Sequence, residues 1–107
     1  MNVRFSDRNI RFRITRDELD RLLSGRSLSL SVPMPHAHQF RANIGIAPVG
    51  DWQLDSDPTG LWLSIPRSIV EDLEQSLPRK EGLKHDFSGP LTVLFEVDLR
   101  KETKAAA

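Results

Sequence analysis

The chain has 107 residues, enough for one domain with a single core, and 28% of them are charged, with a formal net charge of zero. It contains no cysteine, which excludes disulfides, thiolate nucleophiles and thiolate metal sites and fits a cytoplasmic protein. No apolar run approaches the roughly 18–20 residues of a membrane-spanning helix, and Arg and Asp interrupt residues 1–13, so neither a membrane anchor nor a secretory signal is expected.

In the first half, alternation of apolar and charged residues at 9–15 predicts a strand with one buried face. Thr15 followed by Glu18 forms a capping box that begins a helix, and Gly25 ends that helix. Two further alternating runs follow, separated by a proline-containing loop at 33–38. The predicted strands of this half are at 2–5, 9–15, 27–32 and 40–47.

The second half repeats this pattern at a constant distance along the sequence, equal to the separation between Thr15 and Pro66. Pro66 therefore stands at the position of the first helix cap, and its fixed φ begins a second helix, which Pro78 stops. The segment DSDPTG, residues 55–60, indicates a turn. The predicted strands of this half are at 51–54, 61–65, 83–87 and 91–99.

The sequence therefore predicts two strand-strand-helix-strand-strand quasi-repeats, about 1–50 and 51–100, in a single α+β domain spanning 1–100. Residues 101–107 are expected to form a flexible tail. A unit of about 50 residues buries too little surface to be stable alone, whereas two units can share a core. The expected architecture is an antiparallel, strongly twisted sheet or an eight-stranded barrel, with two helices.

Three segments, NVRFSDRNIRFRITRDEL, GLWLSIPRSIVEDL and GPLTVLFEVDL, resemble a family of small bacterial proteins of unknown function. The resemblance covers about half the chain and implies a single domain without implying an activity. Members of that family often carry a cysteine just beyond the last strand, which this chain lacks. The residues that carry the resemblance are Arg4, Asn9, Arg11, Arg13, Thr15, Glu18, Gly89, Pro90, Leu91, Glu96 and Asp98.

Charge is distributed unevenly between the halves. Residues 1–50 carry 8 Arg and 4 acidic residues, net +4, whereas residues 51–107 carry 7 Lys or Arg and 11 acidic residues, net −4. Because a generic nucleic-acid binder is basic overall, nucleic acid is not an expected partner. The pattern indicates attraction between opposite surfaces, within one fold or between copies of it. A phosphate-binding face of N-terminal arginines is the alternative.

Charged side chains on the exposed strand faces are candidates for such a surface. They are Arg4, Arg11, Arg13 and Arg41 in the first half and Glu96 and Asp98 in the second. If the sheet closes into a barrel, these side chains are expected to line a polar tunnel of the kind that hydrolyses phosphoanhydrides. On an open sheet they would instead form cross-strand pairs, each contributing at most about 1 kcal/mol.

His36 and His38 are the most ligand-like pair, because residues i and i+2 of an extended chain project to the same side. A zinc site would need a third ligand, for which His85 and Asp86 are the available donors. Two exposed loop histidines without a metal are the simpler interpretation. No cofactor is indicated.

Trp62 lies on the opposite strand face from the apolar residues around it. It is expected either to pack under the second helix or to contact a partner or a second copy of the chain.

The chain lacks the sequence motifs of the common enzyme classes. It has no G-x-S-x-G, no phosphate-binding glycine loop and no H-E-x-x-H, and it contains no tyrosine. The function predicted from these observations is a non-enzymatic binding or assembly module, with a homodimer as one form of it. The alternative is a phosphate-ligand-binding or phosphoanhydride-hydrolysing barrel that uses the N-terminal arginines and Glu96.

Overall fold

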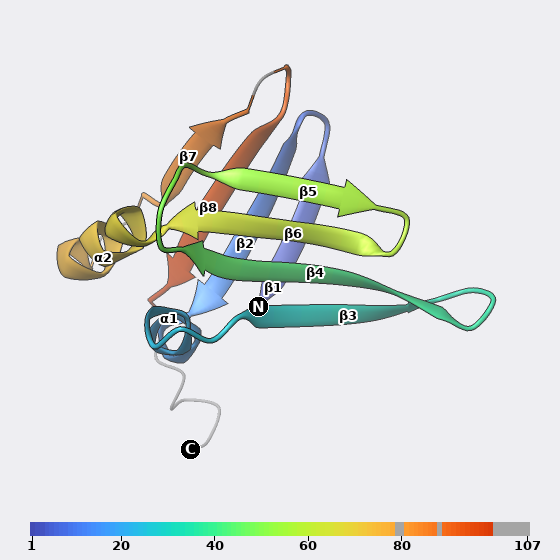
Figure 1. Cartoon of the computed structure of the whole chain (residues 1–107), viewed down its shortest axis with the longest axis horizontal. Helices are drawn as coiled ribbons and strands as arrows, with labels where there is room; N and C mark the ends of the chain where they lie inside the picture. Colours follow the sequence, from blue (N-terminus) through green and yellow to red (C-terminus); the bar gives the residue numbers. More distant parts are fainter. Residues whose placement is uncertain (79–80, 88, 100–107) are drawn as a thin grey trace.

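A computed structural model describes residues 1–78, 81–87 and 89–99, so the predicted tail at 101–107 lies outside the described residues. The described part of the chain forms eight strands and two helices, as predicted (Figure 1). The elements are β1 (Asn2–Ser6), β2 (Asn9–Thr15), α1 (Arg16–Leu23), β3 (Leu28–Met34), β4 (His38–Ala47), β5 (Gln53–Asp57), β6 (Gly60–Pro66), α2 (Arg67–Ser76), β7 (Leu83–Asp86) and β8 (Thr92–Asp98).

The strands form two separate four-stranded sheets. Sheet A has the order β1-β2-β8-β7 and sheet B the order β3-β4-β6-β5. The outer pairs of each sheet are antiparallel, but the central pairs, β2–β8 and β4–β6, are parallel. The prediction of an antiparallel sheet is therefore wrong at these two pairs, and the predicted barrel is wrong because the sheets do not close. Parallel strands must be joined by a crossover connection, and here each parallel pair joins a strand of the first half to a strand of the second. Local alternation of apolar and polar residues does not specify which distant strands pair.

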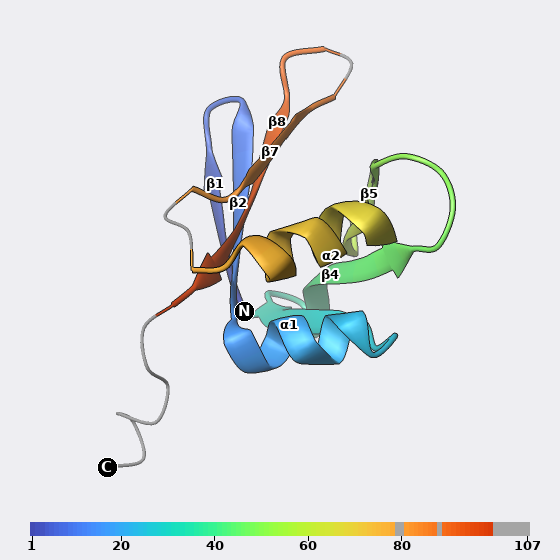
Figure 2. The same ribbon diagram turned by 90° about the vertical axis from the view of Figure 1, so that its left-hand side faces the viewer.

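The two sheets lie face to face with their strands crossing, and both helices close one side of the space between them (Figures 1 and 2). Side chains from both sheets and both helices meet in one buried cluster. Since the inner faces of the two sheets face each other across this core, their outer faces point to opposite sides of the molecule (Figure 2). The buried residues of the core are Phe12, Ile14, Leu19, Leu22, Leu28, Ala42, Ile44, Leu61, Leu63, Ile65, Val70, Leu73, Val93 and Phe95.

The two helices begin differently, as the sequence predicts. The Glu18 amide donates to Thr15 Oγ1 at 3.1 Å, and the Thr15 amide donates to Glu18 Oε1 at 2.9 Å, which completes the capping box of α1. Helix α2 follows Pro66 and has no side-chain cap. Neither helix in the described ranges has the length and apolar character needed to cross a membrane.

Strand pairs related by the sequence offset between the two halves have the same register. Ile10 of β2 pairs with Val93 of β8, and the residues that the offset relates to them, Leu61 and Ala42, pair in sheet B. The antiparallel hairpins β1–β2 and β5–β6 also match residue for residue at this offset. Each sheet therefore combines two strands from the first half of the chain with two from the second.

Candidate binding surfaces on the two sheets

The outer face of the β1–β2 hairpin carries three exposed arginines, Arg4, Arg11 and Arg13, which we call the arginine face. Arg4 and Arg11 are direct cross-strand partners, and Arg13 follows on the same side of β2. Strand alternation places them there, because the intervening Phe12 and Ile14 enter the core. The hairpin thus presents three cations on one side.

These cations are only partly balanced by their own chain. Nε of Arg11 lies 3.7 Å from Oε2 of Glu96 on the neighbouring strand. Arg4 and Arg13 form no ion pair with any carboxylate in the described residues. Since like charges directly opposite each other are unfavourable, Arg4 and Arg11 favour an external anion between them.

Two shallow hollows, each of about 280 Å³, flank Arg4. One is bordered by Arg13, Thr15 and Asp98, and the other by Arg11, Ser6 and Asn9. Guanidinium groups beside amide and hydroxyl groups suit carboxylate, phosphate or sulfate oxygens. The arginines, Glu96 and Asp98 are therefore brought together as the sequence analysis expected, but on an open face and not in a tunnel.

Arg41 does not join this group. It lies on β4, opposite Ser31 of β3 and Gly60 of β6, on the outer face of sheet B. The predicted cluster therefore loses one arginine, because sheet A contains neither β3 nor β4.

The outer face of the β5–β6 hairpin carries Trp62, Asp55 and Asp57, which we call the tryptophan face. Trp62 is 40% exposed, and its direct neighbours are Asp55 on β5 and Asn43 on β4. Both helices pack on the inner face of this sheet, where Leu61 and Leu63 are buried. Trp62 is therefore not covered by α2, and the interpretation that it packs under the second helix is wrong.

Small residues lie before and after Trp62 on the outer face of β6. Ser64 and Gly60 flank it along β6. A Cβ atom on Gly60 would lie 2.1 Å from the carbonyl oxygen of Arg41, so no larger residue fits this approach of β4 to β6. The indole is therefore flanked by small residues along its own strand and by Asp55 and Asn43 on the neighbouring strands.

Both aspartates of the tryptophan face are exposed. The hydroxyl and the amide of Thr59 donate to Oδ1 of Asp57 at 2.6 and 2.7 Å, and these hydrogen bonds lower the pKa of Asp57. Asp57 is therefore ionised at neutral pH. Asp55 has no ion pair among the described residues.

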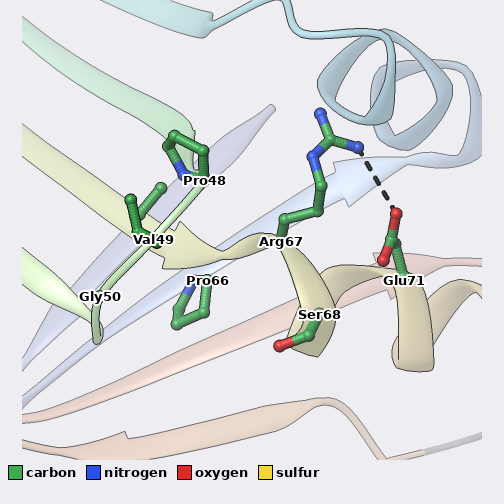
Figure 3. A pocket seen from close by; sticks show the side chains of 8 residues that line it. Pro48, Val49, Gly50, Pro66, Arg67, Ser68 and Glu71 are labelled. Carbon is green, nitrogen blue, oxygen red and sulfur yellow. Dashed lines mark ion pairs between the residues drawn. The ribbon is translucent and has the colours of Figure 1, made fainter.

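A further hollow, of about 380 Å³, lies where the β4–β5 loop meets the start of α2 (Figure 3). Pro48, Val49 and Gly50 form one side of it, and Pro66 and Arg67 form the other. Nη1 of Arg67 donates to the carbonyl oxygen of Leu23 at 3.2 Å and lies 3.6 Å from Oε2 of Glu71 (Figure 3). The two charged side chains at this hollow, Arg67 and Glu71, thus pair with each other, and Arg67 also contacts the end of α1.

The candidate metal ligands are not brought together. His36 has φ of 64° in the turn between β3 and β4, so it does not have the extended geometry on which the pairing with His38 depended. The ring of His85 stacks on Trp52 at a centroid distance of 4.8 Å and an interplanar angle of 7°. Within the described ranges no group of three His, Cys, Asp or Glu side chains is placed to hold a metal ion.

The sequence pattern does not identify Asp55 and Asp57 as strand residues, because DSDPTG is typical of a turn and the predicted strand ends at residue 54. The structure extends β5 to Asp57. The signal was present, since the offset between the two halves aligns this segment with β1 (Asn2–Ser6).

Comparison of the chain with protein-family models, curated proteins and solved structures finds no match.

Proposed function

We propose that this chain is a non-enzymatic binding module that contacts its partner through the tryptophan face. The observation that carries the proposal is the 40% exposure of Trp62 in the middle of an otherwise polar sheet face. A tryptophan supplies more contact area than any other side chain and is enriched among residues that dominate binding energy. Gly60 and Ser64 leave the indole accessible to a partner along its own strand.

The charge of this face supports a partner with cationic groups. Asp55 lies directly beside Trp62, and Asp57 follows at the end of the same hairpin. These two carboxylates outweigh the charge of Arg41, which lies on the same side of the sheet next to Gly60. An indole face attracts Arg and Lys as well as apolar groups, and adjacent carboxylates add charge complementarity. An arginine-containing protein surface satisfies both requirements.

The alternative, a phosphate-ligand site, is supported by the unpaired cations Arg4 and Arg13. It lacks the enclosed tunnel on which a phosphoanhydride-hydrolysing barrel would depend, because the arginines lie on an open face. Thermal melting with added triphosphate tests this alternative, which requires a stabilisation that Arg13→Ala removes.

We also propose that the chain arose by internal duplication of a strand-strand-helix-strand-strand unit. The equal registers of β2–β8 and β4–β6 support this origin, as does the match of β1–β2 with β5–β6.

Site-specific photo-crosslinking tests the binding function. A photoreactive amino acid replaces Gln53, an exposed residue on the outer face of β5, and the protein is irradiated in the cells that naturally produce it. Covalent adducts are expected, and Trp62→Ala should abolish them. The matched control places the same group at Asp72 on α2, where adducts should be absent. If position 53 gives no adduct, the proposed function is wrong.

A further inference from the structure

The two hairpins that carry the arginine and tryptophan faces have the same geometry and opposite charge. Both have strands of five and seven residues paired in the same register. At equivalent positions of the two hairpins, Arg4 corresponds to Asp55 and Arg11 corresponds to Trp62. The directly paired arginines of one hairpin thus have an acidic and an aromatic counterpart at the same places on the other.

From this relationship we propose that the chain associates with itself head to tail, the arginine face of one copy lying on the tryptophan face of the next. The proposal rests on the binding function above and identifies the partner as a second copy.

The spacing of the groups fits this contact. Neighbouring strands are about 4.8 Å apart and same-face residues of one strand about 7 Å apart, and both hairpins share these spacings. When the guanidinium of Arg11 stacks on the indole of Trp62, Arg4 and Arg13 are within reach of Asp55 and Asp57. The contact thus combines one cation–π pair with charge-assisted hydrogen bonds.

The position of the faces determines the form of assembly. They point to opposite sides of the molecule, so one copy engages two neighbours at once (Figure 2). Contacts between unlike faces do not close on themselves unless the rotation between copies forms a ring, so the expected product is a growing row. A twofold contact of two arginine faces is opposed by repulsion among the guanidinium groups of both copies.

The contact also accounts for the charge asymmetry of the chain. The two halves carry opposite net charges of +4 and −4, yet Arg4, Arg13 and Asp55 find no ionic partner inside the described molecule. Attraction between the two halves of one copy therefore does not neutralise these three charges. Attraction between copies uses them.

Sedimentation equilibrium of the full chain tests the proposal with one variant of each face. Arg4→Glu disables the arginine face, and Trp62→Arg disables the tryptophan face because it would oppose Arg11 of the neighbouring copy. The two altered faces also repel each other, since the new carboxylate would meet Asp55 and the new guanidinium would meet Arg11. In low salt the wild-type average mass is expected to rise with concentration past that of a dimer. Each variant alone should remain a monomer, whereas an equal mixture of the two should form a species of two chains and stop there, because only one intact contact remains.

Two exposed sites away from both faces provide matched controls, since Arg26→Glu and Gln75→Arg make the same charge changes and should leave the wild-type association intact. Raising the salt to about 1 M, where the Debye length falls to about 3 Å, should dissociate the wild type. Thermal melting of each variant establishes that it is folded.

A monomeric wild type at millimolar concentration would overturn the proposal, as would an Arg4→Glu variant that dimerises by itself or a mixture that stays monomeric. The crosslinking at position 53 separates this failure from that of the binding function. An adduct of twice the chain mass supports both proposals. An adduct with another protein retains the binding function and overturns self-association.

Discussion

The ammonium group of Met1 lies 2.8 Å from Oε2 of Glu18, and the side chains of these two residues are only 2% and 13% exposed. Glu18 also accepts the Thr15 amide and therefore connects the start of β1 with the start of α1. Burial by itself would raise the pKa of Glu18, but the hydrogen bond from the Met1 ammonium, the Thr15 amide and nearby Arg21 together lower it.

The lowered pKa of Glu18 predicts acid sensitivity. The ionised carboxylate contributes stability that is fully present above its ordinary pKa of 4.5 and is lost as the pH falls through the lowered folded-state value. Glu18→Gln should therefore reduce the free energy of unfolding at about pH 7 and have a smaller effect at about pH 3. Urea unfolding at both pH values measures this. Asp72→Asn, an exposed carboxylate on α2, serves as the control and should change little at either pH.

Gly60→Ala should destabilise the protein by about 2 kcal/mol or more, because the added Cβ meets the Arg41 carbonyl and separates β4 from β6. Gly45→Ala provides the comparison within the same sheet, since its Cβ would lie 3.5 Å from Ser27 Oγ, an ordinary contact. Chemical denaturation of both variants checks the difference. Equal losses would mean that the close approach of β4 to β6 does not determine stability.

The two tryptophans should separate stability from binding. Trp52 stacks on His85 and packs against the core, so Trp52→Ala should lower the unfolding free energy by about 2 kcal/mol. Trp62→Ala removes an outward side chain and should lower the unfolding free energy by about 1 kcal/mol or less while abolishing the crosslinks from position 53. A large loss of stability in Trp62→Ala would instead assign it a packing role.

Neither half of the chain should fold alone. The fragment 1–50 contains two hairpins that belong to different sheets, and each central pair needs a strand from 51–107. Separate fragments should show no cooperative thermal transition by circular dichroism, and mixing them should restore one. A cooperative transition of either fragment alone would contradict the shared core.

Local patterns predicted the elements well and their pairing poorly. The capping box at Thr15, the helix start after Pro66 and the buried alternation around Phe12 all follow from neighbouring residues, and the structure contains them. The parallel pairing of β2 with β8 depends on contacts between residues as distant in the chain as Asn9 and Thr92, for which alternation carries no information.

The candidate site was only partly predictable for the same reason. Arg4, Arg11 and Arg13 are on one hairpin, so the sequence places them together. The separation of Arg41 from them, and the exposure of Trp62, depend on which strands share a sheet and which face the helices cover.

The unequal spans of the two parallel pairs imply an order of assembly during synthesis. Sheet B joins Arg41 to Gly60 across a short stretch, so it can form once residue 66 has left the ribosome. Sheet A must wait for Thr92–Asp98, and until then Phe12 and Ile14 lack the strand that covers their edge. The nascent chain therefore passes through a stage in which the first hairpin synthesised, β1–β2, is the last to gain its neighbouring strand.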